Sequence, residues 1–433
     1  MQPGDHIELD ITSVAHGGVF VGRHEGRVVF VPDAIPGERV RVQLTQTGEK
    51  SFWRGETVEV MDASAHRRPH VWRQADVEVP PERRPGGADF GHIALDHQRA
   101  LKLEVLQDAL QRMGGVDLPV RMVTIDGDDG SRWRTRVSLH VDDEGRVGPY
   151  AARSHRVIEV DDLPLATEAI ARTAADVAPE APGRIDLVEP ADGRVRVLAR
   201  PRHDKRVGKH DKGDEKRHRG PGATRRAAPA KRRNPAREVV VERVGSREFL
   251  VDAGGFWQVH RGAAAALTDL VRQTLPALDP DALHLDLYGG VGLFAATLGE
   301  AGASRIVSVE SDARATEHAG ENLAEWVGAR AETGRVDRWL PQFREQAGER
   351  DLARLRSGVV VLDPPRSGAG GDVVRELVTL GPASIVYVAC DPVALARDLT
   401  TFGEGGYAPA SVTAVDLFPN SHHVEAVTLL TRV

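Results

Sequence analysis

The sequence predicts an α/β protein in which a small β-barrel and an α+β segment precede a mostly parallel sheet. From residue 251 onward, apolar strand-like runs alternate with helical stretches, which is the pattern of a parallel sheet with helices on both faces. Residues 1–62 instead hold short alternating runs broken by Gly and Pro, typical of a small barrel. The length of 433 residues suits two or three domains, and we expect them to cover 1–62, 63–250 and 251–433.

The composition excludes several classes of protein. The chain has one cysteine, so an internal disulfide framework, a Cys-based zinc finger and a Cys-ligated iron–sulfur cluster are ruled out. No run approaches the ~18 apolar residues of a membrane span, and the N-terminus lacks the basic and apolar regions of a secretory signal. We therefore expect a cytoplasmic protein with no membrane partner.

Charge is distributed unevenly along the chain. The formal net charge is −7, which by itself argues weakly against a nucleic-acid partner. Residues 201–237, however, hold 14 Lys and Arg against 4 Asp and Glu, with Val207 as their single large aliphatic residue. Such a segment cannot offset its ordering entropy by burial, so we expect it to be disordered. It either binds RNA non-specifically or is a solvated insertion without a role.

Residues 1–62 are the first expected domain. The run IELDITSVA is followed by two glycines and then by short alternating runs with a Gly or Pro every few residues. A five-stranded barrel of this kind is a common oligonucleotide-binding fold. The pattern also fits an SH3-like barrel or another small β domain, because fold does not fix function.

Residues 63–250 are the second expected domain. A stretch rich in Pro, Arg and His covers 63–93, and apolar residues at helical spacing predict a helix over 94–113 that could pack on the third domain. One further helix is expected near 167–178. Strand-like runs occupy 134–141, 145–152, 155–160 and 194–199.

Ligands of such parallel sheets bind at the carboxyl ends of the strands. The first strand is followed by Tyr288 and a glycine-rich turn that includes Gly290, where the backbone can approach a ligand closely. The second is followed by Glu310, which lies 24 residues after Asp286 and is suited to accept hydrogen bonds from ribose hydroxyls. These features indicate a nucleoside cofactor and fit both NAD and S-adenosylmethionine. A glycine-rich turn can also serve packing alone.

Three more candidate residues follow or precede later strands. Asp363 is followed by two prolines, which fix the turn and hold the carboxylate in place. Cys390 ends the next strand before another Pro-fixed turn, a position that favours a nucleophile over a buried structural thiol. Glu425 precedes the last strand and is expected to be a general base. His422 and His423 match no zinc-binding spacing, so we expect no metal there and interpret them as turn or substrate contacts.

Five motifs occur in order along the second half of the chain. They are Phe256–Val259, Asp286–Gly292, Asp363–Gly368, Ala389–Pro392 with Leu395–Leu399, and Phe418–Glu425. Together they resemble the RNA uracil-5-methyltransferase family. The resemblance extends forward through Tyr150 and Ser154–Val157, and the N-terminal barrel is similar to the family's TRAM RNA-binding domain.

The resemblance implies a fold, an activity and roles for individual residues. The fold would be a Rossmann-like class I S-adenosylmethionine methyltransferase domain, preceded by an OB-like TRAM barrel and a central α+β domain. The activity would be methyl transfer from S-adenosylmethionine to C5 of a uridine in structured RNA. Cys390 would attack C6 of the base and Glu425 would remove the C5 proton. The cofactor site would be lined by Gln258, Tyr288, Gly290, Glu310 and Asp363.

The chain differs at several positions from the residues that are commoner in this family. Asp391 follows the cysteine where Asn is commoner, and Gly289 stands where a Cys is commoner. An ionised Asp391 would raise the pKa of the neighbouring thiol. Many members carry a four-cysteine iron–sulfur site, and its positions here include Pro85, Ala88 and Leu163. We therefore expect no iron–sulfur cluster.

The expected partner is RNA, and the N-terminal barrel favours ribosomal over transfer RNA. We expect a monomer. Two alternatives remain open from the sequence. One is an NAD-linked oxidoreductase, and the other is a noncatalytic RNA-binding or ribosome-assembly protein that uses a methyltransferase fold.

Overall fold

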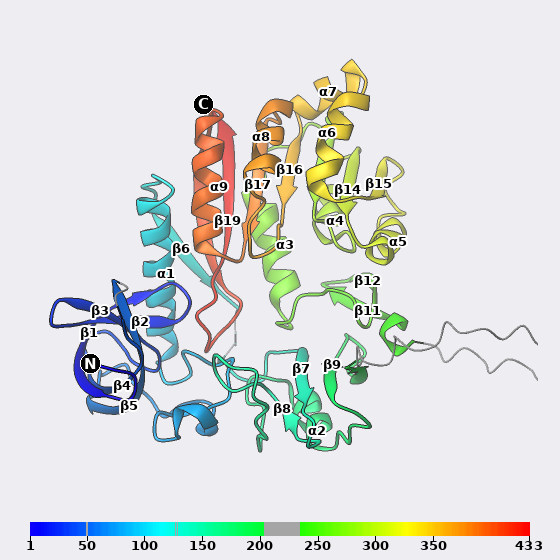
Figure 1. The fold of residues 1–433 in the computed structure, drawn as a ribbon. Helices are drawn as coiled ribbons and strands as arrows, with labels where there is room; N and C mark the ends of the chain where they lie inside the picture. Colours follow the sequence, from blue (N-terminus) through cyan, green and yellow to red (C-terminus); the bar gives the residue numbers. More distant parts are fainter. Residues whose placement is uncertain (49–50, 126, 128, 203–233) are drawn as a thin grey trace, which may run out of the picture.

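The computed structural model describes residues 1–48, 51–125, 127, 129–202 and 234–433. The expectation of disorder in the basic segment 201–237 falls almost entirely on 203–233, outside the described residues. In Figure 1 the main sheet occupies the upper part of the molecule, and the barrel and a smaller sheet lie below it.

The N-terminal strands form the expected barrel. Within the described residues they close in the order β1-β2-β3-β5-β4. Alternate residues of β1 face inward, and Ile7, Leu9 and Ile11 are buried there, as the two-residue period of a strand requires. The strands are β1 His6–Ala15, β2 Val19–His24, β3 Arg27–Val31, β4 Arg39–Gln46 and β5 Phe52–Asp62.

The helix expected over 94–113 is α1 (Leu95–Arg112). Two short 3-10 turns, Arg73–Ala75 and Pro81–Arg83, precede it. One face of α1 packs against α9 and β6 of the main sheet. The fully buried Lys102 donates to Asp416 at 2.6 Å and to the carbonyl of Phe418 at 2.9 Å, and pairing compensates part of the cost of burying both charges.

The smaller sheet lies beside the barrel in the lower part of Figure 1. Within the described residues its strands run in the order β10-β9-β7-β8, and α2 (Glu168–Ala175) packs on β9. The strands are β7 Arg136–Val141, β8 Val147–Gly148, β9 Gly183–Val188 and β10 Arg196–Pro201.

The strand expected at 155–160 is wrong, and β9 was not expected. Tyr150 and Val157 form only an isolated bridge. Ile158 donates its N–H to the carbonyl of Pro149 at 2.9 Å, so the segment folds back on itself as a loop beside β8. β9 lies between β10 and β7 in the smaller sheet.

The main sheet is mostly parallel, as expected. Within the described residues its order is β15-β14-β13-β16-β17-β19-β18-β6, and β19 is antiparallel to both of its neighbours. The strands are β6 Val120–Thr124, β13 His284–Leu287, β14 Ile306–Glu310, β15 Ala329–Thr333, β16 Val359–Leu362, β17 Ser384–Ala389, β18 Tyr407–Asp416 and β19 Glu425–Arg432.

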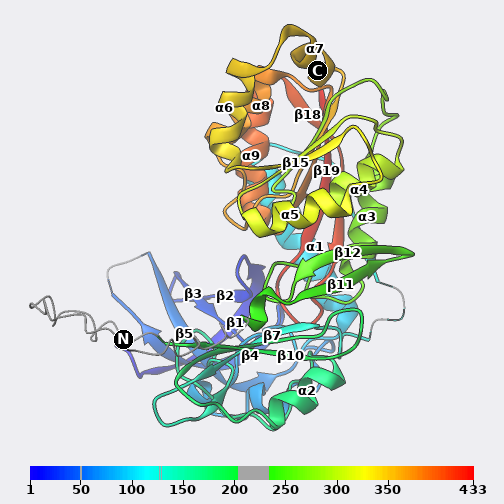
Figure 2. The ribbon, with the colours of Figure 1, turned by 90° about the vertical axis from the view of Figure 1, so that its right-hand side faces the viewer.

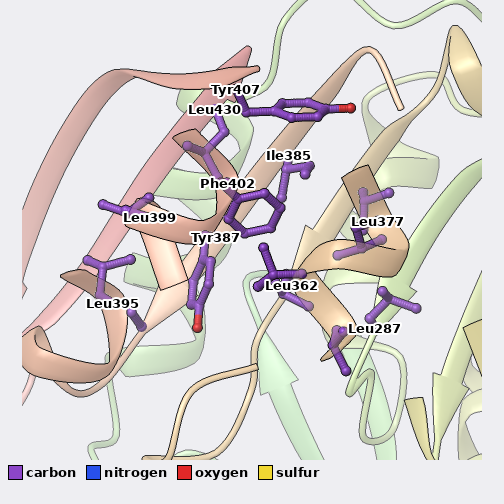
Figure 3. Packing of buried hydrophobic residues seen from close by; sticks show 14 of the residues in the cluster. Leu287, Leu362, Leu377, Ile385, Tyr387, Leu395, Leu399, Phe402, Tyr407 and Leu430 are labelled. Carbon is purple, nitrogen blue, oxygen red and sulfur yellow. The ribbon is translucent and has the colours of Figure 1, made fainter. Parts of the chain in front are cut away.

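Helices cover both faces of this sheet because alternate strand residues point to opposite sides. In β17, Ile385 and Tyr387 join the apolar cluster under α8 and α9, whereas Val386 and Val388 join the cluster under α3 and α4. Figure 3 shows the first of these clusters, in which side chains of α9 pack over β17. The helices are α3 Ala263–Thr274, α4 Leu293–Glu300, α5 Ala313–Asn322, α6 Val336–Gln346, α7 Glu349–Arg356, α8 Gly371–Leu380 and α9 Pro392–Glu404.

The edge strand β6 comes from a part of the chain that we had expected to belong to the second domain. Val120 pairs in parallel with Val412 of β18. A long edge strand such as β18 exposes unpaired backbone groups, and β6 satisfies them. The division into 1–62, 63–250 and 251–433 stays a prediction, and β6 is an exception to it.

The carboxyl ends of the parallel strands face the lower half of the molecule. β19 ends near the C-terminus at the top of Figure 1, and β17 runs antiparallel to it. In both views the hairpin of β11 (Val239–Val244) and β12 (Arg247–Asp252) lies between the main sheet and the smaller sheet. Among the described residues, no helix is both long and apolar enough to cross a membrane.

Candidate functional site

The residues singled out from the sequence lie together. A cavity of about 1420 Å³ opens at the carboxyl ends of the strands. Its wall also includes Arg134, which the sequence pattern had not marked, and Phe256 and Arg366, which belong to two of the five motifs without an assigned role. All seven expected site residues line it, namely Gln258, Tyr288, Gly290, Glu310, Asp363, Cys390 and Glu425.

The turn after β13 brings the backbone close to this cavity. Tyr288 has a φ of +63° and Gly290 a φ of +55°. A positive φ is uncommon for a residue with a side chain and marks strain of about 1–3 kcal/mol. Below the turn, the buried Asp286 accepts hydrogen bonds from Ser308 Oγ and from the N–H of Ala295, each at 3.0 Å. The turn is therefore held from beneath in a conformation that it would not adopt alone.

Gly289 and Ser308 fit each other. A Cβ atom on Gly289 would lie 2.0 Å from Oγ of Ser308 and 2.7 Å from a carboxylate oxygen of Asp286. Such separations are well inside van der Waals contact, so the larger side chain that is commoner at this position has no room beside Ser308. Gly289, one of the positions where the chain differs from the sequences it resembles, thus leaves the space in which Ser308 donates its hydrogen bond to Asp286.

Glu310 is oriented at the end of β14. Its Oε2 accepts from the N–H of Gly290 at 3.2 Å, and its Oε1 accepts from Ser311 Oγ at 2.9 Å and from the N–H of Asp312 at 2.8 Å. These donors fix the carboxylate at the cavity wall. A carboxylate held in this way is suited to accept hydrogen bonds from a pair of vicinal hydroxyls.

Asp363 follows β16 and contributes its side chain to the cavity wall. Among the described residues, no group donates a hydrogen bond to its side chain, which lines the cavity after β16. Burial raises the pKa of Asp363 to about 7, and the charge of Asp286 adds to the effect. A donor or a cation in the cavity would stabilise the ionised form.

The loop after Asp363 is fixed by Asp398 of α9. The carboxylate of Asp398 accepts from the N–H groups of Ala369 at 2.7 Å and Gly370 at 3.3 Å, and from the hydroxyl of Tyr387 at 2.7 Å. Asp398 belongs to the motif over 395–399, and these contacts explain why that motif contains a carboxylate.

Cys390 and Glu425 lie at the same end of the sheet on neighbouring strands. Cys390 is half-buried between β17 and α9, and Glu425 is buried at the start of β19. Burial raises the pKa of Cys390 to about 12, and the charges of Glu425, Asp363 and Asp391 act in the same direction while Arg366 opposes them. Burial and Asp363 raise the pKa of Glu425 to about 8. The site is thus rich in carboxyl groups, and it disfavours the thiolate unless a positive charge enters.

The loop before Glu425 is tied to the N-terminal half of the chain. Asn420, with a φ of +65°, is fully buried. Its side-chain oxygen accepts from Arg68 at 2.5 Å and from Gln98 at 3.0 Å, and its N–H donates to Gln98 at 2.8 Å. This network explains why Asn is present in the motif over 418–425: its short side chain tolerates a positive φ and carries both donors and acceptors.

The paired histidines, which we interpreted from the sequence as turn or substrate contacts, each lie against a side chain of another segment. Nδ1 of His422 lies 2.6 Å from Oδ2 of Asp89, and Nε2 of His423 lies 3.3 Å from Arg366. Burial, with the positive neighbours His422 and Arg366, lowers the pKa of His423 to about 3. In the part of the chain that the structure describes, no cluster of three or more His, Cys, Asp or Glu could hold a metal ion.

Comparison with known proteins decides what this arrangement belongs to. The profile of the TRAM domain matches residues 1–58, and that of tRNA (uracil-5-)-methyltransferase matches residues 273–433. An RNA methyltransferase of Streptomyces avermitilis is 37% identical over 99% of this chain and 98% of its own length. The 23S rRNA (uracil(1939)-C(5))-methyltransferase RlmD of Halomonas elongata is 31% identical over 98% of this chain and 89% of its own length.

The chain belongs to the RNA uracil-5-methyltransferase family. It is therefore an enzyme, an S-adenosylmethionine-dependent RNA methyltransferase with a TRAM domain. This membership removes the NAD-linked oxidoreductase that the glycine-rich turn had left open.

A solved structure shares the fold of the methyltransferase. The tRNA (uracil-54, C5)-methyltransferase of Pyrococcus abyssi, in complex with S-adenosyl-L-homocysteine, superposes with a TM-score of 0.67. The two proteins are 19% identical, and the alignment covers 98% of this chain and 100% of the other. The likeness confirms the expected Rossmann-like class I architecture with its additional N-terminal parts.

The cavity residues fit S-adenosylmethionine as cofactor. Glu310 offers a fixed carboxylate for ribose hydroxyls, and the carboxylate of Asp363 suits a donor or a positively charged group. An iron–sulfur cluster does not fit the central region. Ala88 and Leu163 have no metal-ligating side-chain atom and pack in an apolar cluster with Trp72.

We expect replacement of Glu425 by glutamine to raise the melting temperature, and the gain to grow with pH. In the folded protein burial raises the pKa of Glu425 to about 8, so the carboxyl holds a proton that the unfolded chain, with a Glu pKa of about 4.3, releases. The free energy of unfolding therefore falls as the pH rises between these values. Glutamine avoids this loss.

Scanning calorimetry tests this expectation at two pH values. We expect the Glu425→Gln protein to melt about 2–4 °C above the unaltered protein near pH 8.5 and to differ little from it near pH 4.5. Glu404→Gln, at an exposed position near the end of α9, is the matched control. A gain of equal size at both pH values would contradict the raised pKa.

Proposed function

We propose that this methyltransferase transfers a methyl group to C5 of a uridine through a covalent bond between Cys390 and C6 of the base. The observation that carries the proposal is that the chain's lone thiol and the buried carboxyl of Glu425 line the same cavity as Gln258, Glu310 and Asp363. A nucleophile, a candidate base and a cofactor site therefore share one space.

The thiol has a chemical task because C5 of uracil is a poor nucleophile. Attack by the Cys390 thiolate forms the S–C6 bond, and the electrons of the C5–C6 double bond move onto C5 and O4 as an enolate. C5 then forms a bond to the methyl carbon. The bond between the methyl carbon and the cofactor's sulfur breaks, and its electron pair stays on that sulfur. One difficult step is thereby divided into easier ones, and orientation within the cavity supplies part of the acceleration.

Glu425 completes the reaction as general base. Its carboxylate takes the proton from C5, and the enolate that forms expels Cys390 and restores the C5–C6 double bond. With a pKa raised to about 8, the carboxyl is well matched to accept a proton near neutral pH. Elimination regenerates the thiolate for the next turnover.

The cofactor would be held by the residues around the turn after β13. When bound, S-adenosylmethionine supplies a methyl group on a positively charged sulfur. Glu310 would accept hydrogen bonds from the ribose, Asp363 would accept from a donor of the cofactor, and Gln258, Tyr288 and Gly290 would complete the wall. The positive charge would offset the carboxylates that raise the pKa of Cys390.

We propose a single-stranded or remodelled segment of ribosomal RNA as substrate. The target base must leave its stack to reach a thiol inside a cavity, and the ring of Phe256, 73% exposed on the cavity wall, offers a stacking surface. The Halomonas elongata relative named for 23S rRNA supports ribosomal over transfer RNA. We further propose that the enzyme works in the cytoplasm as a monomer.

RNA that contains 5-fluorouridine tests the covalent step. Fluorine at C5 cannot leave as a proton, so the adduct should persist after methyl transfer. We expect a complex that withstands denaturation, and a nucleotide attached to the peptide that carries Cys390 by mass spectrometry. An adduct on another residue would refute the proposed role of Cys390. The absence of any adduct would refute it too, if the enzyme methylates the same RNA when it contains ordinary uridine.

A further inference from the structure

A turn of the N-terminal barrel reaches the loop that carries the thiol. Between β1 and β2, Nε2 of His16 lies 2.9 Å from Oδ2 of Asp391, although 375 residues separate them in the sequence. The same turn also packs closely against His422, because a Cβ atom on Gly18 would lie 2.8 Å from the ring of that histidine. A second cavity of about 170 Å³ lies at this junction, and both His16 and Cys390 line it.

Asp391 connects that turn to the helix that follows Cys390. Its other carboxylate oxygen, Oδ1, accepts a hydrogen bond from the N–H of Ala394 at 2.8 Å and so caps α9. One carboxylate therefore contacts the barrel with one oxygen and the first turn of α9 with the other. Because Asp391 directly follows Cys390, this arrangement fixes the backbone next to the thiol.

The same carboxylate affects the charge balance of the thiol. Negative charge on Asp391 adds to that of Glu425 and Asp363 in raising the pKa of Cys390, while Arg366 opposes them. The hydrogen bond with Asp391 raises the pKa of His16 despite partial burial. The imidazolium form is therefore favoured, and it offsets the charge of Asp391.

We propose that His16 is a positioning residue for Cys390, which fixes the turn at Asp391 and balances the negative charge beside the thiol. The inference rests on the proposed role of Cys390 as nucleophile, but it concerns the reactivity of the thiol itself. It gives the barrel a part in the chemistry: a residue of the RNA-binding domain tunes the nucleophile. An Asn at position 391, the commoner residue in the family, would need no such partner.

The single cysteine makes the test direct, because every alkylated thiol in the folded chain is Cys390. We would measure the rate of carboxamidomethylation by iodoacetamide in the full-length protein between about pH 6 and 9, without RNA or cofactor. Below its pKa, the alkylation rate of a thiol scales with the fraction present as thiolate. The variants are His16→Ala, His16→Gln, Asp391→Asn and the double variant His16→Ala/Asp391→Asn, and exposed His6→Ala in β1 is the control.

We expect His16→Ala and His16→Gln to slow alkylation about threefold near pH 7, which corresponds to a rise of about half a unit in the pKa of Cys390. The difference should shrink above the pKa of His16, where the unaltered imidazole also loses its charge. In the Asp391→Asn background, His16→Ala should have little effect on the rate, and His6→Ala should match the unaltered protein.

An equal effect of His16→Ala in both backgrounds, or none in either, would overturn the inference. The double variant distinguishes an effect of charge on Cys390 from an effect of reagent access to its thiol. Loss of the imidazole would open the junction in both backgrounds, whereas the charge of Asp391 is present in only one of them. Binding of S-adenosylhomocysteine by calorimetry shows that each variant is folded. Failure of the proposed function would be seen separately, as the absence of a 5-fluorouridine adduct on Cys390 in the unaltered enzyme.

Discussion

Replacing Cys390 with alanine is expected to abolish methyl transfer to RNA and to leave cofactor binding unchanged. Without addition of a thiolate at C6, C5 does not become nucleophilic enough to accept the methyl group, and removal of a covalent nucleophile typically costs about 10⁴-fold or more in rate. The chain has no second cysteine, so no neighbouring thiol can substitute.

Transfer of a radiolabelled methyl group into RNA measures this loss. Calorimetric titration with S-adenosylhomocysteine on the same variant is the control, because Gln258, Glu310 and Asp363 are untouched by the substitution. Retention of full methylation would eliminate the covalent mechanism.

Replacing Glu425 with glutamine is expected to stop the reaction after methyl transfer, with the methylated base still bonded to Cys390. Addition of Cys390 and methyl transfer need no carboxylate at this position, but the C5 proton then has no base, so the S–C6 bond cannot be broken by elimination. We expect turnover to fall by about 10²–10⁴-fold and a methylated covalent complex to accumulate with ordinary, unfluorinated RNA.

Denaturing electrophoresis and peptide mass spectrometry detect that complex. Its mass should include the added methyl group, and it should be absent when Cys390 is also replaced. Glu404→Gln, at an exposed position of α9, should turn over like the unaltered enzyme. Loss of turnover without a methylated complex would assign Glu425 to an earlier step and contradict its role as the base for the C5 proton.

Much of the candidate site could be predicted because it depends on a rule of sheet geometry. Tyr288, Asp363 and Cys390 each follow a parallel strand and Glu310 ends one, and the carboxyl ends of such strands meet at one edge. The local pattern of apolar runs located those ends, so the residues could be placed together without knowledge of the strand order. Glu425 begins an antiparallel strand, and it therefore reaches the same edge from the other direction.

Other features depend on contacts between distant segments, which leave no local pattern. β6 was not among the strand-like runs expected from the sequence, and nothing in its five residues indicates that it pairs with β18. The turn at His16 looks like any glycine-containing hairpin, and its contact with Asp391 follows only from how the barrel packs on the main sheet. Arg134 likewise acquires its place in the cavity wall from the packing of other elements around it.

The strand order of the main sheet has a consequence for how the protein is synthesised. β19 lies between β17 and β18, and β18 pairs with β6, which is made about 290 residues earlier. During translation, β6 lacks its partner until β18 has been made, and the edge of β17 lacks its partner until β19 has been made. Closure of the sheet also brings Glu425 to the end of β17 that carries Cys390, so a nascent chain that ends before β19 holds the thiol without this carboxyl beside it. The long-range pairing that finishes the sheet is thus the same event that brings the thiol and the buried carboxyl into one cavity.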